Sequence, residues 1–78
     1  MRWTGVPKTP EHRRVLGENI RARRKQTGFS QEKLAEQADL HPVYVGNVER
    51  GEENISIDSL ARIAHALNVS ISDLVNGL

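Results

Sequence analysis

The strongest constraint on this chain is that its apolar residues form several short helical segments, none of which can bury itself. The clearest segment follows Ser56, a helix-capping residue, and its apolar side chains recur three or four residues apart. They are Ile57, Leu60, Ile63, Ala64 and Leu67. Because a helix with one apolar face needs neighbours to cover that face, the chain is expected to fold by packing short helices against one another.

Capping residues predict two helices in the first half of the chain. Thr9-Pro10-Glu11 is a good helix start, because a hydroxyl can cap, proline fits the first helical position and an acid suits the first turn. This helix is expected to span about residues 10–27 and to stop at Gly28 in a left-handed conformation. Ser30 is expected to cap a second helix over about residues 31–38. The predicted core residues of the two helices are Val15, Leu16, Ile20, Leu34, Ala35 and Ala38.

Two more short helices complete the prediction. His41 is expected to cap a helix over residues 42–49, in which Val45 and Val48 point inward. Ser70 and Asp73 have the spacing of a capping box, which predicts a last short helix. Five helices joined by loops of a few residues, with no strand, predict a compact all-α domain over residues 10–78. Residues 1–9 are expected to form a flexible basic arm.

Composition narrows the function classes. The 78-residue chain has no cysteine and no apolar run of the roughly 20 residues that cross a membrane. No Ser-His-acid arrangement, phosphate-binding glycine loop or metal-ligand cluster is recognisable. We therefore expect a cytoplasmic protein that is not an enzyme and that holds no metal, cofactor or small-molecule ligand.

Charge is unevenly distributed along the chain although the net charge is only +1. Residues 1–28 carry eight basic side chains and two acids, whereas residues 29–78 carry three basic side chains and eight acids. A basic block suggests a polyanion as partner, and a solvated helix face with a flexible arm is the equally simple alternative.

From Leu16 to about Val75 the sequence resembles the helix-turn-helix family of phage repressors and Cro, often called XRE-like regulators. The resemblance is carried by "GFSQ" at residues 28–31, "VERG" at residues 48–51 and "SLARIAHALNVSISDLV" at residues 59–75. The stretch "DLHPVYVGNVERGEENIS" is most similar to the small controller proteins of restriction–modification systems. The resemblance implies a lambda-repressor-like fold, with a helix-turn-helix motif at about residues 31–50. It also implies a transcription regulator, a repressor or autoregulator, that binds a palindromic operator in double-stranded DNA as a homodimer.

Site residues follow from the same resemblance. The helix over residues 42–49 is expected to enter the major groove, with base-reading positions at Pro42, Val43, Gly46 and Asn47. Asn47 can pair with adenine through two hydrogen bonds, and Val43 can contact a thymine methyl group. Phosphate contacts are expected from Gln31, Tyr44, Arg50, Asn54, Arg13 and Arg14. Turn chemistry explains Asn54 equally well.

Two structural roles complete this set. Arg24 and Glu49 match a buried ion pair that in the family ties the first helix to the end of the recognition helix. Apolar residues near the C-terminus exceed what a small core needs, and we expect them to form the dimer interface or to cover the bottom of the bundle. They are Ile71, Leu74, Val75 and Leu78.

A protein-interaction module, such as an antitoxin or adaptor with the same fold, is the alternative function. The small set of base-reading side chains and the acidic second half of the chain favour it. Gln31 and the spacing of the two central helices favour DNA.

Overall fold

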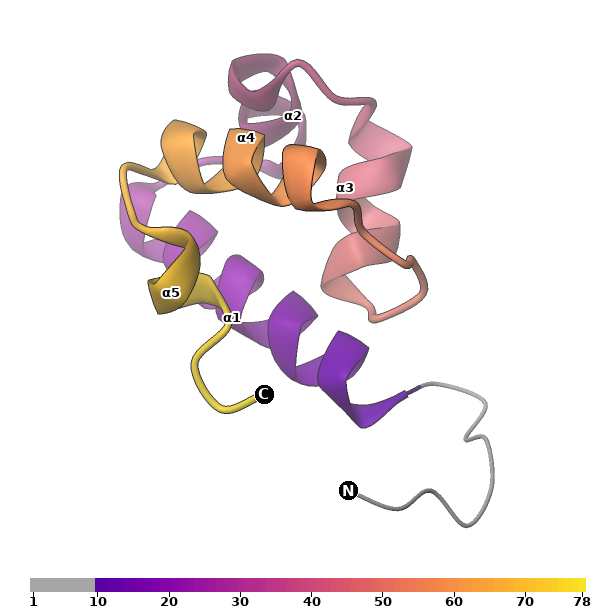
Figure 1. The fold of residues 1–78 in the computed structure, drawn as a ribbon. Helices are drawn as coiled ribbons and strands as arrows, with labels where there is room; N and C mark the ends of the chain where they lie inside the picture. Colours follow the sequence, from indigo (N-terminus) through magenta and orange to yellow (C-terminus); the bar gives the residue numbers. More distant parts are fainter. Residues whose placement is uncertain (1–9) are drawn as a thin grey trace, which may run out of the picture.

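The computed structural model describes residues 10–78, and these residues form five helices and no strand (Figure 1). The helices are α1 (Glu11–Thr27), α2 (Gln31–Ala38), α3 (Pro42–Glu49), α4 (Ile57–Leu67) and α5 (Ile71–Leu74). The prediction of an all-α domain is confirmed. The expected arm, residues 1–9, lies outside the described residues.

The helix ends follow the local chemistry of the sequence. The side chains of Ser30, Ser56 and Ser70 each accept a hydrogen bond from a backbone N–H of the next turn, and His41 does the same through Nδ1. The predicted capping box at Ser70 is complete, since the Asp73 carboxylate accepts the Ser70 N–H at 3.0 Å.

Among the helix ends, the start of the first helix differs from the prediction. Pro10 is the N-cap residue of α1 rather than its first helical residue, because its ψ of 135° is not helical. Thr9, the expected cap, lies outside the described residues. At the other end Gly28 has the predicted left-handed conformation, with φ 82°.

Every helix contributes to one core. Fully buried side chains come from α1, α2, α3, α4 and α5, respectively Ile20, Leu34, Val45, Ile63 and Leu74. Two members of the predicted apolar series lie elsewhere. Ile57 is 69% exposed because it begins α4 beyond the edge of the core, and Val15 is only partly buried. The short helices therefore depend on one another for stability.

The crossing of α1 and α3 is unusually close. A Cβ atom on Gly17 would lie 2.4 Å from the carbonyl oxygen of Val48 and 2.5 Å from that of Glu49. Only glycine leaves room for the last turn of α3 at this place. This contact, together with packing against α2, sets the position of α3 on the bundle.

Candidate nucleic-acid interface

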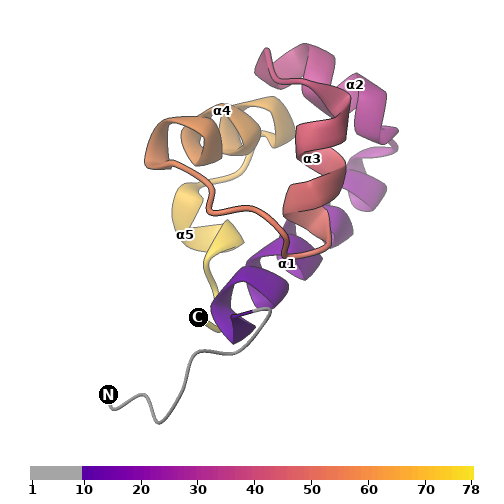
Figure 2. The same ribbon diagram turned by 90° about the vertical axis from the view of Figure 1, so that its right-hand side faces the viewer.

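Helix α3 lies at the edge of the molecule, with one face packed on α1 and α2 and the other open (Figure 2). Val45 and Val48 are buried on the inner face, as predicted. On the outer face, Pro42 and Val43 are exposed and Asn47 is partly buried. The Val43 side chain is 63% exposed and is therefore accessible from solvent.

Gly46 lines a surface hollow together with Pro42, Val43, Gln31 and Arg50, and its role as a base-reading position stays a prediction. Gly46 is buried, because the side chains of Gln31 and Arg50 lie over it. A Cβ atom at this position would be 3.4 Å from Gln31 Oε1 and 3.4 Å from Arg50 Nη1. The absence of a side chain at Gly46 therefore makes room for these two polar side chains.

A buried polar network anchors the C-terminal end of α3. Arg24 donates two hydrogen bonds to the Glu49 carboxylate, from Nε at 2.6 Å and from Nη2 at 3.0 Å, and a third to the Phe29 carbonyl oxygen at 2.9 Å. The Arg24 and Glu49 side chains are only 10% and 2% exposed. The predicted ion pair is therefore present, and it links α1, α3 and the turn before α2.

Gln31 extends this network in a way that the sequence did not indicate. Its Nε2 donates to Glu49 Oε1 at 3.0 Å, so the first residue of α2 holds the last residue of α3. Its side chain is partly buried at the N-terminus of α2, where the helix dipole favours an anion. One N–H of the amide remains for a further acceptor.

The Asn47 amide is held on both sides by charged groups. Its Nδ2 donates to Glu53 Oε2 at 3.2 Å, and its Oδ1 accepts a hydrogen bond from Arg50 Nη2. Arg50 also pairs with Glu52, from Nε to Oε1 at 3.3 Å. The contact with Glu53 was missed because it depends on the path of the loop after α3.

The other predicted phosphate ligands differ in how far they are exposed to solvent. Asn54 is exposed, and Tyr44 and Arg13 are partly buried. Arg14 lies on the surface of α1 and pairs with Glu11 and Glu18. The hydrogen bond with Arg14 holds the pKa of the Glu11 carboxyl below its usual range and raises the pKa of Arg14.

Comparison with known proteins identifies the family of this fold and the function of that family. The Helix-turn-helix family model matches residues 20–74. The control protein C.SmaI of Serratia marcescens is 44% identical over 61 residues, which are 78% of this chain and 73% of that protein. This chain belongs to the XRE-type helix-turn-helix family of DNA-binding transcription regulators.

Solved structures agree with this assignment. The restriction–modification controller protein C.AhdI from Aeromonas hydrophila has a TM-score of 0.79 and 37% identity, covering 80% of this chain and 94% of that one. SinR, described as the master regulator for biofilm formation, was solved in complex with DNA; it has a TM-score of 0.75 and 34% identity, covering 78% and 98% of the two chains. These relatives are transcriptional regulators, which is the class that the sequence predicted.

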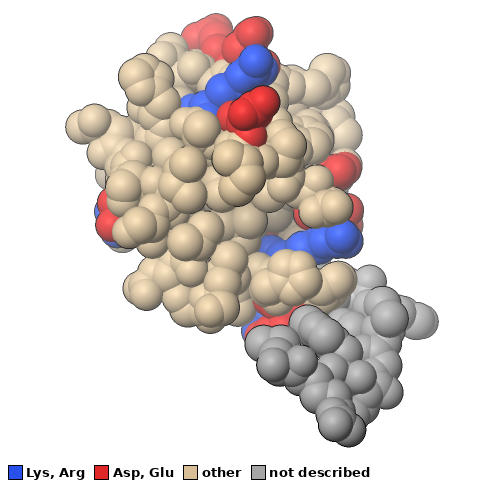
Figure 3. Space-filling model, viewed as in Figure 1, with Lys and Arg blue, Asp and Glu red and all other residues tan. Residues whose placement is uncertain are grey.

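The predicted dimer surface of the regulator is smaller than expected. Leu74 is fully buried in the core of its own chain, so it has no surface to offer a partner, which corrects its assignment to an interface. Ile71 and Val75 are partly buried, and Leu78 is 55% exposed. Figure 3 shows few charged side chains on the face that carries α4, α5 and the C-terminal residues.

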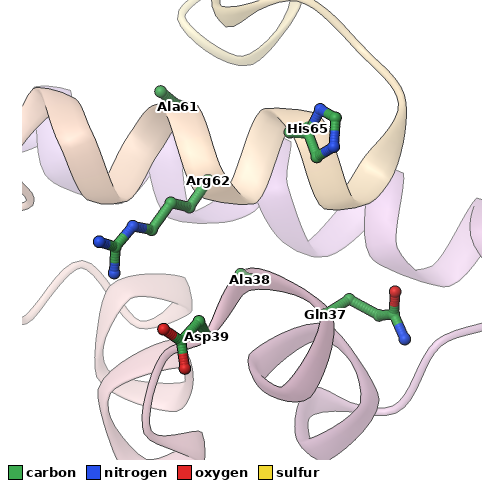
Figure 4. Close-up of a pocket in the computed structure, with 6 residues that line it drawn as sticks. All are labelled: Gln37, Ala38, Asp39, Ala61, Arg62 and His65. Carbon is green, nitrogen blue, oxygen red and sulfur yellow. The ribbon is translucent and has the colours of Figure 1, made fainter.

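A shallow hollow of about 410 Å³ lies between the end of α2 and α4, lined by Gln37, Ala38, Asp39, Ala61, Arg62 and His65 (Figure 4). Arg62 extends from α4 towards the turn that contains Asp39.

Within residues 10–78 there is no group of three or more metal-ligating side chains. No helix in this part of the chain is long and apolar enough to cross a membrane.

Proposed function

We propose that the regulator binds a palindromic operator as a homodimer, with α3 of each copy in the major groove. The observation that supports this most strongly is that α3 keeps one face open while Arg24 and Gln31 fix its far end through Glu49. A recognition helix needs this combination, because base contacts are specific only when their positions are fixed. Asn47 and Val43 would read bases, and Pro42 would approach the groove at the start of the helix.

Phosphate contacts would position the dimer on the duplex. Gln31 has an unused N–H at the start of α2. Tyr44 is on α3, Asn54 is in the loop that follows it and Arg13 is on α1. Arg50 and Arg14 form exposed ion pairs with neighbouring acids, and solvent screening makes such pairs weak. Exchanging these acids for phosphate oxygens would therefore cost little.

Dimerisation would use Ile71, Val75 and Leu78. The proposal rests on the exposed fraction of Leu78 and on the scarcity of charge around α5 (Figure 3). A twofold dimer would place its two recognition helices about 34 Å apart, one turn of DNA, and would read two inverted half-sites. One dimer on its operator would then control a promoter by occupying it.

The remaining parts of the proposal concern the whole chain. We infer that residues 10–78 act as a single DNA-binding domain in the cytoplasm and that the basic arm, residues 1–9, adds phosphate contacts. No catalytic role is proposed, since the relatives are transcription regulators. Loss of the basic arm should reduce the salt dependence of binding, because each phosphate contact adds about 0.9 to the slope of log K against log salt.

The test is selection from a random duplex library by the full chain at moderate salt, followed by sequencing of the bound fraction. An enriched palindrome is expected. Enrichment of a single half-site would contradict the dimer, and no enrichment by folded protein would favour the protein-interaction module instead.

A further inference from the structure

We propose that Glu53 is a positioning residue for sequence recognition: its carboxylate fixes the direction of the Asn47 amide, so that donor and acceptor face DNA in one order only. This inference rests on the proposed function, in which Asn47 reads a base. It concerns a residue of the loop after α3, outside the helix that enters the groove.

The path of the loop brings the two side chains together. Gly51 has a left-handed φ of 78°, and the chain turns back so that the Glu52 N–H donates to the backbone carbonyl of Asn47 at 2.9 Å. This turn places Glu53 beside Asn47, where its Oε2 lies 3.2 Å from Nδ2. Glu53 is partly buried there, whereas Glu52 points to solvent and pairs with Arg50.

The chemistry allows only one direction of the amide. With Nδ2 towards the Glu53 carboxylate and Oδ1 towards the Arg50 guanidinium, both contacts are charge-assisted hydrogen bonds. A flipped amide would set oxygen against a carboxylate and N–H against a guanidinium, since neither charged group can exchange donor for acceptor. The two neighbours therefore disfavour the flip together.

The contacts with Glu53 and Arg50 leave hydrogen-bonding capacity on the Asn47 amide. An amide has two N–H donors and an oxygen with two lone pairs, so one donor and one acceptor remain after Glu53 and Arg50 are satisfied. Adenine requires one of each in a fixed order, at N7 and at the N6 amino group. A fixed amide also loses less freedom on binding than a rotating one, which favours the correct base.

The alternative is that Glu53 competes with DNA for Asn47. The two cases give opposite signs, because a positioning residue raises the ratio of operator affinity to random-DNA affinity and a competitor lowers it. Removal of the negative charge is expected to raise affinity for all DNA in either case, so the ratio is the informative quantity.

The experiment measures this ratio for the full chain with Glu53→Gln, Glu52→Gln and Asn47→Ala, on the selected operator and on random duplex. Glu52→Gln is the matched control, since it removes the same charge from the neighbouring residue, whose carboxylate pairs with Arg50 and makes no hydrogen bond to the Asn47 side chain. Asn47→Ala should lower the ratio by about tenfold or more. Glu53→Gln should lower it about three- to tenfold, Glu52→Gln should leave it nearly unchanged, and Glu53→Gln should have no further effect when added to Asn47→Ala.

A rise in the ratio, no change, or the same fall when Asn47 is absent would each overturn the inference. NMR of the Asn47 side-chain amide tests the contact without DNA: Glu53→Gln should shift its Nδ2 proton signals and Glu52→Gln should not, and unshifted signals in the first variant would also overturn the inference. Failure of the proposed function is distinguishable, because it would appear as a wild-type protein without any preferred sequence.

Discussion

Replacement of Gly17 by alanine should separate α1 from α3 and destabilise the regulator. The added Cβ would meet two backbone carbonyl oxygens, at 2.4 Å and 2.5 Å, whereas ordinary contacts of a Cβ atom begin near 3.4 Å. The difference requires a shift of about 1 Å. Backbone atoms held in a helix cannot rotate away as a side chain does, so the two helices must move apart.

The cost of this shift can be bounded. Overpacking of a core typically costs about 1–3 kcal/mol, and a clash with two backbone atoms belongs at the upper end of that range. Alanine recovers about 0.5–1 kcal/mol because glycine is a poor helix former. The expected net decrease in the free energy of unfolding is about 2 kcal/mol, which for a domain of this size corresponds to a fall in Tm of about 10 °C.

Thermal and urea unfolding followed by circular dichroism would measure this loss. Gly46→Ala is the matched control, because Gly46 is also buried in a helix and its new Cβ would meet only the ends of two flexible side chains at 3.4 Å. That variant should be at least as stable as the parent. The reasoning about the helix crossing would be refuted if Gly17→Ala proved as stable as Gly46→Ala.

Three further predictions follow from the contacts described above. Arg24→Met should lower the free energy of unfolding by about 3–5 kcal/mol, because it leaves Glu49 buried without its cation, and the double variant Arg24→Met/Glu49→Leu should be more stable than the single one in urea unfolding. Hydrogen bonds from the backbone and side chain of Ser70 hold the pKa of Asp73 below its usual range, so the ionised form favours the folded state. The stabilisation is full above the ordinary aspartate range and is lost as pH falls through the lowered pKa; the protection of the Ser70 amide relative to its intrinsic hydrogen-exchange rate should therefore fall in acid in the parent and lack this pH step in Asp73→Asn. Leu78→Glu should weaken both dimerisation and operator binding, whereas Val43→Glu should weaken operator binding alone, as measured by analytical ultracentrifugation and DNA titration.

Helix positions could be predicted from the sequence because local chemistry determines them. Ser30, His41, Ser56 and Ser70 each cap the helix that was expected to follow, and α2 and α3 have the predicted bounds. Local chemistry does not determine how deeply a side chain is buried in the helix bundle. Ile57 has the right spacing for the core and is exposed, because the spacing of a helix face does not show where the core ends.

Site residues were predictable to the extent that they share a face of one helix. Arg24 and Glu49, 25 positions apart, were expected as a pair only through resemblance to a family. The contact of Glu53 with Asn47 and the narrow crossing at Gly17 depend on tertiary structure. A glycine inside a helical segment was the available signal for Gly17, since it costs helix stability and therefore indicates a packing reason.

Helix α3 is only eight residues long, and a helix of that length is marginal by itself in water. Its position is therefore set by what holds its two ends. The start is capped by His41, and the end is fixed by Glu49, which Arg24 and Gln31 reach from α1 and α2. Because Gln31 is both a proposed phosphate ligand and a partner of Glu49, a phosphate bound by its second N–H would act directly on the end of α3. Contact with the DNA backbone and placement of the base-reading face would then be coupled through one side chain, and Gln31→Ala should reduce discrimination between sequences as well as affinity.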